Sequence, residues 1–148
     1  MRDYLKAGPL GFPVVDVAVA LTDGSFHSVD SSDAAFQTAG RLAMSEGMPG
    51  CAPVLLEPVM RVEVDTPGEE QGDLLGDLTR RRGNILAVEA GQNSVLLNAQ
   101  VPLAEMWGYA NAIRSLSRGR ASYSMSPSHF ERVPAGLAMK IATASGSD

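Results

Sequence analysis

Arginine is concentrated in two short clusters, and its guanidinium group is well suited to binding phosphate. The clusters are Arg80-Arg81-Arg82 and the group of Arg114, Arg118 and Arg120. The chain of 148 residues has a net charge of −5, but residues 72–120 carry six arginines against four acidic residues. Local positive charge sets the field that a phosphate meets, and the planar fork of arginine can donate paired hydrogen bonds to it. The two clusters therefore predict contacts with phosphate groups.

A helix end explains part of this pattern without any ligand. Each cluster lies at the C-terminal end of a predicted helix, where a positive side chain is favoured by about 0.3–1 kcal/mol. That effect accounts for one arginine in each cluster. Consecutive residues point in different directions around a helix, so at least one of Arg80, Arg81 and Arg82 faces away from the helix carbonyl groups. Phosphate contact is the natural use of that side chain.

Other chemistry is poorly supported by the residue types. The chain has no Gly-Lys pair, which excludes the phosphate-binding loop of nucleotide-hydrolysing enzymes. Its one cysteine, Cys51, cannot form an internal disulfide, and His27 and His129 have no companions at ligand spacing. Asp73 and Asp77 lie four residues apart on one predicted helix, where a solvated face explains them better than acid–base catalysis. We therefore expect no catalytic residue, no metal site and no cofactor in this chain.

The elements that position the arginines follow a clear order within residues 58–126. Met60, Val62 and Val64 alternate with charged residues, which predicts a half-buried strand. The other expected elements are a helix from Pro67 to Gly83, strands at 84–89 and 95–101, a helix from Pro102 to Gly119 and a strand at 121–126. The order β-α-β-β-α-β is the split βαβ, or ferredoxin-like, arrangement. Its two helices run antiparallel, so the clusters should mark opposite ends of one face.

The side chains on this predicted sheet limit how RNA could be read. The outward positions of the strands are polar: Arg61, Glu63, Asn98, Gln100, Ser122 and Ser124. Without aromatic side chains there, the sheet cannot stack bases as RNA-recognition-motif domains do. Trp107 falls on the apolar stripe of the second helix, and we expect it in the core. RNA binding would then use helix ends and loops, and would read phosphates rather than sequence.

Residues 1–57 predict a smaller set of elements. Strands are expected at 14–21, 26–29 and 53–57, with a tight turn at 22–25. A helix should follow and run to about Gly47, with Asp30, Ser31 and Ser32 as candidate caps. His27 lies just beyond the turn and is most simply a surface histidine. These elements are too few to enclose a core, so we expect the segment to be one part of a domain.

No apolar run approaches the ~18 residues that span a bilayer, and the first residues lack the apolar stretch of a secretory signal. A single cysteine is typical of a reducing compartment. We therefore expect a cytoplasmic protein that does not contact a membrane.

Several segments resemble bacterial elongation factor G. Residues 11–17 and 23–32 resemble the second half of its domain IV. Residues 53–64 resemble its passage into domain V, and residues 72–83, 101–109 and 114–121 resemble domain V itself. They occur in the family's order from about Gly8 to Pro134. The chain departs from the family at Glu70-Gln71, at residues 48–51 and at residues 90–94, which points to a divergent paralogue.

The resemblance implies a fold of the α+β class. Residues 1–57 would form a partial α/β unit like domain 2 of ribosomal protein S5, and residues 58–128 the ferredoxin-like unit. Residues 129–148 would carry a short helix, from Pro134 to Ala142, that returns to the first unit, followed by a frayed tail.

The resemblance also implies a function. Elongation factor G is the ribosome-stimulated GTPase that moves transfer RNA and messenger RNA after peptide-bond formation. Its domain IV tip reaches the decoding centre, and its domain V lies near the factor-binding region of the large subunit. The chain would then be a C-terminal, non-enzymatic fragment, whose parent binds GTP and magnesium through an N-terminal GTPase domain in cis. The implied partners are the ribosome, with its large-subunit RNA and decoding centre, together with tRNA and mRNA.

The implied RNA-contact residues lie in both parts of the chain. They are Asp23, Gly24, Ser25 and His27 at the tip, and Arg80, Arg81, Arg82, Arg114, Arg118 and Arg120. Two alternatives stay open: a ferredoxin-like regulatory or protein-interaction module, and a paralogous GTPase fragment that serves ribosome protection or recycling.

Overall fold

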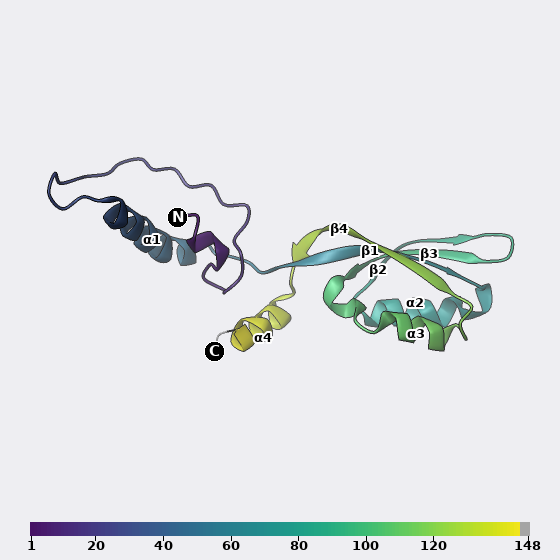
Figure 1. The fold of residues 1–148 in the computed structure, drawn as a ribbon. Coiled ribbons are helices and arrows are strands. Elements are labelled where there is room, and N and C mark those ends of the chain that lie inside the picture. Colours follow the sequence, from purple (N-terminus) through teal and green to yellow (C-terminus); the bar gives the residue numbers. More distant parts are fainter. Residues whose placement is uncertain (146–148) are drawn as a thin grey trace. The chain divides into compact units, whose positions relative to one another are not determined.

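The structure is a computed structural model that describes residues 1–145 (Figure 1). The chain forms two compact units. Residues 56–132 make one, here called the sheet unit, and residues 1–55 with the segment that starts at Val133 make the other, the terminal unit. The two arginine clusters belong to the sheet unit, and the segment from Asp23 to His27 belongs to the terminal unit.

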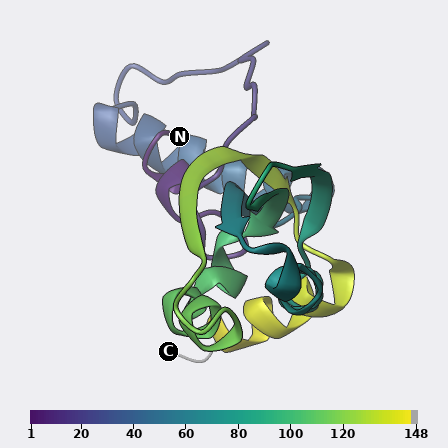
Figure 2. The same ribbon diagram turned by 90° about the vertical axis from the view of Figure 1, so that its right-hand side faces the viewer.

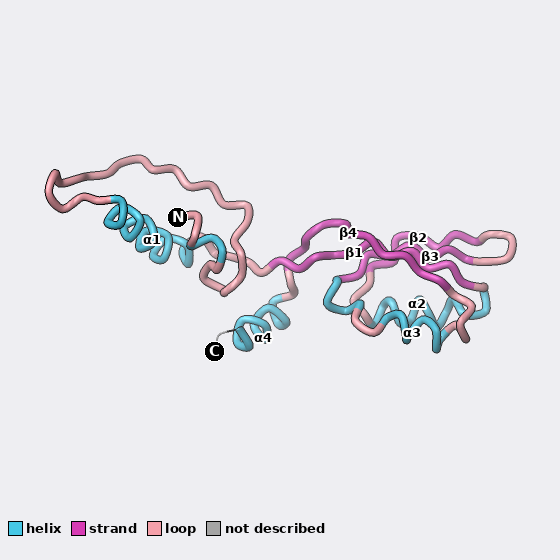
Figure 3. Tube along the Cα trace, viewed as in Figure 1, coloured by secondary structure: helices cyan, strands magenta, loops and turns pink. Residues whose placement is uncertain are grey.

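A four-stranded antiparallel sheet forms the frame of the sheet unit. Its strands are β1 (Leu56–Thr66), β2 (Asn84–Ala90), β3 (Val95–Pro102) and β4 (Ser122–Arg132), in the spatial order β2-β3-β1-β4. Two helices, α2 (Gln71–Arg80) and α3 (Tyr109–Leu116), lie on one face of this sheet (Figure 1, Figure 2 and Figure 3). The predicted α+β class and the β-α-β-β-α-β order are confirmed. Both edges of the prediction change: β1 starts only at Leu56, so the strand expected at 53–57 is not formed over residues 53–55, and its last two residues join the next strand. β4 continues past residue 126.

The core lies between the sheet and the two helices. Val62 and Val64 of β1 are fully buried, and the alternating residues Arg61 and Glu63 are exposed, as the pattern predicts. The helices and the other strands bury Leu74, Leu78, Leu97, Ala99, Val101, Tyr109 and Ile113 against them.

The end of α2 depends on a left-handed residue. The sequence predicts Gly83 as the stop, but the helix ends at Arg80, and Arg82 adopts φ of 59°. The amide of Gly83 then donates to the carbonyl of Leu78 at 2.8 Å and closes the turn. Gly83 is needed for space, because a Cβ there would lie 2.5 Å from the Leu78 oxygen and 3.2 Å from Cγ2 of Val101.

Replacing Gly83 with alanine is expected to lower the free energy of unfolding by about 1–3 kcal/mol, because backbone atoms would have to move to admit the methyl group. The matched control is Gly76→Ala within α2, where a Cβ would meet nothing within 4 Å. That substitution should raise stability by about 0.5–1 kcal/mol, the usual gain over glycine in a helix. Urea denaturation of the two variants measures both changes, and a neutral Gly83→Ala would contradict the packing described here.

The second helical segment is broken where the sequence predicts one helix from Pro102 to Gly119. A 3₁₀ turn, η3 (Leu103–Met106), is followed by Trp107 and Gly108, and α3 starts only at Tyr109. Gly108 has φ of 73°, a left-handed conformation that glycine adopts without strain. The break leaves Trp107 82% exposed, so its predicted core position is wrong.

The terminal unit is built on helices. They are η1 (Tyr4–Lys6), α1 (Asp33–Gly50) and α4 (Ala135–Ser145). Oγ of Ser32 accepts a hydrogen bond from the amide of Ala35 at 3.2 Å, so Ser32 is the cap of α1 among the three candidates. The α4 helix extends beyond its predicted end at Ala142 into the expected tail, whose last residues, 146–148, lie outside the described residues.

Residues 1–55, all of which the structure describes, contain no strand. The predictions of strands at 14–21 and 26–29 and of the turn that joins them as a hairpin are wrong. A strand is held by hydrogen bonds to its neighbours, and an isolated two-stranded hairpin is only marginally stable. The alternating apolar side chains therefore remain exposed in an extended loop: Val15, Val19, Leu21, Phe26 and Val29.

Candidate nucleic-acid interface

Arg80 is the most exposed arginine of the first cluster. It is the last residue of α2, and 72% of its side chain is accessible to solvent. Its Nη2 atom lies 3.4 Å from Oδ1 of Asp77, a long contact that leaves the remaining donors in solvent. Arg80 can therefore contact a phosphate without giving up a buried interaction.

Arg81 is held by protein acceptors. Its Nε donates to Oδ2 of Asp77 at 2.8 Å, and its Nη1 donates to the carbonyl of Glu105 at 2.5 Å and to that of Trp107 at 3.3 Å. The guanidinium group also lies 5.1 Å from the centre of the Tyr109 ring, within range of a cation–π interaction. Arg81 thus joins the end of α2 to the turn that precedes α3.

Arg82 lies in an ion-pair network. Its Nη1 and Nη2 donate to the two carboxylate oxygens of Glu57 at 2.7 and 2.8 Å, and its Nε donates to Glu105 at 2.9 Å. The hydrogen bond to Glu57 is the largest of the effects that raise the pKa of Arg82 above its ordinary value, and Glu105 adds to it against the opposing effect of burial. These contacts tie α2 to the start of β1 and to η3.

Tyr109 is a buried neighbour of this network. Burial raises its pKa to about 12, with a further contribution from the negative charge of Asp77. Its ring packs edge-on against Tyr123 with the centroids 4.9 Å apart. The phenol is thus a structural group.

The second cluster is divided in the same way. Nη2 of Arg120 pairs with Oε1 of the buried Glu70 and, at 3.1 Å, with Oε2 of Glu69. Arg114 and Arg118 are exposed, and neither side chain forms a hydrogen bond or ion pair with any described residue. Arg118 has φ of 53° in the turn that ends α3.

The contacts of the two clusters fix how α2 and α3 are arranged. Arg81 reaches from the end of α2 to Trp107 before α3, and Arg120 reaches from beyond α3 to Glu70 at the start of α2. The helices are therefore antiparallel, and the clusters lie at opposite ends of the helical layer, as predicted. Each end offers exposed cations: Arg80 at one, and Arg114 and Arg118 at the other.

Three consecutive arginines do not require a phosphate here, because two of them have protein partners. Arg81 and Arg82 point away from the helix carbonyl groups, as predicted, but they meet Asp77, Glu57 and Glu105. These carboxylates accept hydrogen bonds from the guanidinium groups that the sequence analysis expects to contact phosphate.

The tip candidates lie together in the exposed loop of the terminal unit. Oδ1 of Asp23 accepts a hydrogen bond from the amide of Gly24 at 2.7 Å. The amide of His27 donates to Oγ of Ser31 at 2.8 Å, and the amide of Ser31 donates back to the carbonyl of His27 at 3.0 Å. Ser25 is exposed between them. The side chain of His27 is exposed and available for contact.

Comparison with known families decides the relationship. The model for the elongation factor G C-terminus matches residues 54–141, and the model for elongation factor G, domain IV, matches residues 1–52. The chain belongs to the elongation factor G family. The motif resemblance is thereby confirmed, and the chain corresponds to a C-terminal part of such a factor.

A solved structure supports the same assignment. A crystal structure of a Thermus thermophilus protein matches with a TM-score of 0.89 and 41% sequence identity, over 99% of this chain and 22% of that one. The chain thus spans about a fifth of the length of that relative.

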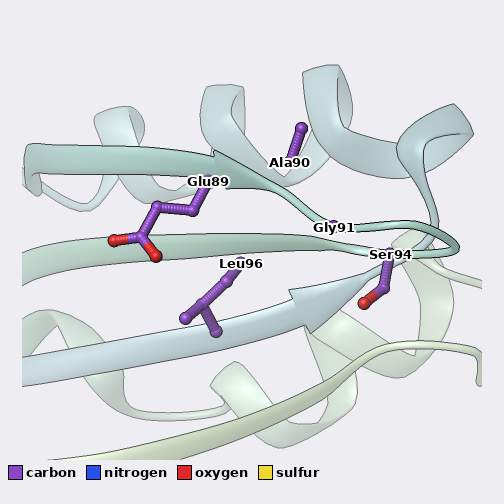
Figure 4. Close-up of a pocket in the computed structure, with 5 residues that line it drawn as sticks. All are labelled: Glu89, Ala90, Gly91, Ser94 and Leu96. Carbon is purple, nitrogen blue, oxygen red and sulfur yellow. The ribbon is translucent and has the colours of Figure 1, made fainter.

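Other surfaces of this elongation factor G part offer less for a ligand. A shallow depression of about 190 Å³ lies at the β2–β3 hairpin, lined by Glu89, Ala90, Gly91, Ser94 and Leu96 (Figure 4). Its one charged group is a carboxylate, which disfavours phosphate. Among the described residues there is no group of three or more histidine, cysteine or acidic side chains that could hold a metal, and no helix that could cross a membrane.

Two features of the interface differ from what the sequence predicts: the acidic partners of Arg82 and the exposure of Trp107. The acidic partners Glu57 and Glu105 lie 25 and 23 residues from Arg82, beyond any local pattern. The exposure of Trp107 had a signal, since the Trp-Gly pair places a helix-breaking residue inside the predicted helix.

Proposed function

We propose that this chain is the ribosome-binding C-terminal part of a translational GTPase and that it takes part in the translocation of tRNA and mRNA. The observation that carries the proposal is the presence of exposed arginines at both ends of one helical layer, Arg80 at one end and Arg114 and Arg118 at the other. Membership of the elongation factor G family supports it.

The proposed mechanism is binding and positioning. Two separated cationic sites can hold two backbone segments of large-subunit RNA at once, and such contacts fix orientation without reading sequence. The loop with Asp23, Gly24, Ser25 and His27 would contact tRNA and mRNA at the decoding centre. GTP and magnesium would be bound by the GTPase domain of the parent factor in the cytoplasm, and this chain would supply no catalytic residue.

The triple variant Arg80→Ala, Arg114→Ala, Arg118→Ala tests the proposal. Each phosphate contact contributes about one unit to the slope of log affinity against log salt, so the slope for binding to large ribosomal subunits should become shallower by about three units. The affinity at low salt should fall in parallel. Co-sedimentation at several potassium concentrations measures both quantities.

The matched control is Arg61→Ala, which removes an exposed positive charge from the opposite face of the sheet. It should leave both quantities nearly unchanged. If the affinity for the subunits changes neither with salt concentration nor in the triple variant, the proposal is rejected. The regulatory-module alternative predicts that outcome, together with thermal stabilisation by a small ligand or by self-association.

A further inference from the structure

Trp107 is the one tryptophan of the chain, and its side chain does not contribute to the hydrophobic core. It is 82% exposed, between the buried residues Met106 and Tyr109. A tryptophan ring offers on the order of 200 Å² of largely apolar surface, and leaving it in water forgoes the largest burial that a single side chain can provide. Folding alone gives no reason for this position.

The backbone holds Trp107 in place. Nη1 of Arg81 binds the carbonyls of Glu105 and Trp107, and Gly108 takes the left-handed conformation that starts α3. The neighbours Met106 and Tyr109 anchor both sides of the turn in the core. The backbone that carries the indole is therefore held in one conformation, which lowers the conformational entropy lost when a ligand binds to Trp107.

The surroundings of Trp107 distinguish between kinds of partner. The other large exposed apolar side chains of the sheet unit lie on β2 and β4: Leu86, Val88, Met125 and Phe130. Trp107 is therefore the one large exposed apolar side chain of the helical layer among the described residues, whereas a protein partner usually covers a patch of several. Charged groups lie near its backbone instead, since the carbonyl of Trp107 accepts a hydrogen bond from Arg81, and Asp77 contacts both Arg81 and the exposed Arg80. The carboxylate of Glu105 is paired with Arg82, so Arg80 is the most exposed cation at this end of the helical layer.

We propose that Trp107 is a stacking platform for one unpaired nucleobase of RNA, and that Arg80, at the same end of the helical layer, contacts a phosphate of the same strand. Proteins bind single-stranded nucleic acid by combining cations for the backbone with aromatic side chains that stack on bases, and every base has a face that can stack. The inference rests on the proposed function. It adds a base contact to a surface whose other contacts are phosphates, and it names a residue that the sequence pattern assigned to the core.

The experiment compares Trp107→Ala, Trp107→Phe and Trp107→Leu in the full chain. Loss of one stacked base lowers affinity by about 5- to 150-fold, so Trp107→Ala should bind large ribosomal subunits more weakly by a factor in that range. Phenylalanine keeps an aromatic face and should retain most of the affinity. Leucine keeps apolar bulk without that face and should behave like alanine. Because Trp107 is exposed, all three variants should keep the thermal midpoint of the parent chain.

A second measurement identifies the occupant. Trp107 is the only tryptophan, so the tryptophan emission of the chain reports on this site alone. Titration with protein-free large-subunit RNA, refolded in magnesium, should quench the emission as the base stacks on the indole. Binding to intact subunits without quenching by the RNA would indicate a ribosomal protein as the partner and overturn the inference.

The remaining outcomes separate the inference from the proposed function. If the parent chain and Trp107→Ala bind equally, and binding still depends on salt and on the exposed arginines, the stacking inference fails and the proposed function stands. If leucine rescues binding as well as phenylalanine does, the contact is apolar burial and the inference fails. If the parent chain does not bind the subunits at all, both fail.

Discussion

Replacing Arg82 with alanine is expected to lower the free energy of unfolding of the sheet unit by about 2–3 kcal/mol. Both oxygens of Glu57 accept hydrogen bonds from Arg82, and only 11% of the Glu57 side chain is exposed. Removing the cation leaves that carboxylate largely buried and uncompensated, which costs about 3–5 kcal/mol for a fully buried pair. Arg82 keeps 29% exposure, so water recovers part of the loss and the lower figure is expected.

Two companion variants isolate the ion pairs from other effects. Arg82→Gly also removes them but relieves the left-handed backbone, so it should be less destabilising than Arg82→Ala by about 1 kcal/mol. Arg80→Ala removes a neighbouring arginine that is exposed, and it should change stability by less than about 0.5 kcal/mol. Urea denaturation gives all three values. An Arg82→Ala variant no less stable than Arg80→Ala would show that the Glu57 pair contributes nothing.

The same variants separate stability from phosphate binding. If Arg82 is committed to Glu57 and Glu105, Arg82→Ala should leave the salt slope of ribosome binding unchanged at a temperature at which the variant is folded. Arg80→Ala should reduce that slope by about one unit. Neighbouring residues of one cluster would then have distinct roles.

The sheet unit could be predicted from the sequence because its signals are local. The alternation around Val62 and Val64 and the helical spacing of Leu74 and Leu78 each report burial on one face, and the structure buries all four. Periodicity of this kind depends on which side of an element faces the core. It does not depend on knowing the residues that pack opposite.

The terminal unit shows where local signals are insufficient. Residues 14–21 alternate as a strand should, but a strand also requires a partner for its backbone hydrogen bonds, and the terminal unit supplies none in its described residues. Alternation alone therefore predicted structure that the fold does not contain. By contrast, the cap of α1 needs only residues up to Ala35, and the sequence narrowed it to three candidates that include Ser32.

The candidate site was predictable in its location and less so in its parts. The positions of the arginines at opposite ends of the helical layer follow from helix boundaries and topology. Which arginines are exposed depends on Glu57, Glu70 and Glu105, whose proximity arises only from tertiary folding. The core position predicted for Trp107 is wrong for a related reason. The left-handed Gly108 interrupts the expected helix, so Trp107 faces solvent and does not lie on an apolar helical stripe.

Arg120→Ala is expected to be about as destabilising as Arg82→Ala, at about 2–3 kcal/mol. Its partner Glu70 lies at the start of α2 with 6% of its side chain exposed, and Oε2 of Glu70 has no hydrogen-bond partner in the described part of the chain. Arg120 is the cation that compensates this buried carboxylate. Without it the charge keeps only the favourable field of the helix start, worth up to about 1 kcal/mol.

A double-mutant cycle with Glu70→Gln tests this account. Because glutamine removes the buried charge, Arg120→Ala should cost about 1–3 kcal/mol less in the Glu70→Gln background than in the parent chain. The exposed Glu69 provides the control, and Glu69→Gln should change stability by less than about 0.5 kcal/mol. A coupling free energy near zero would mean that the ion pair between Arg120 and Glu70 does not contribute to stability. Arg120 would then belong with Arg114 and Arg118 as a phosphate contact, and its removal would reduce the salt slope of ribosome binding by a further unit.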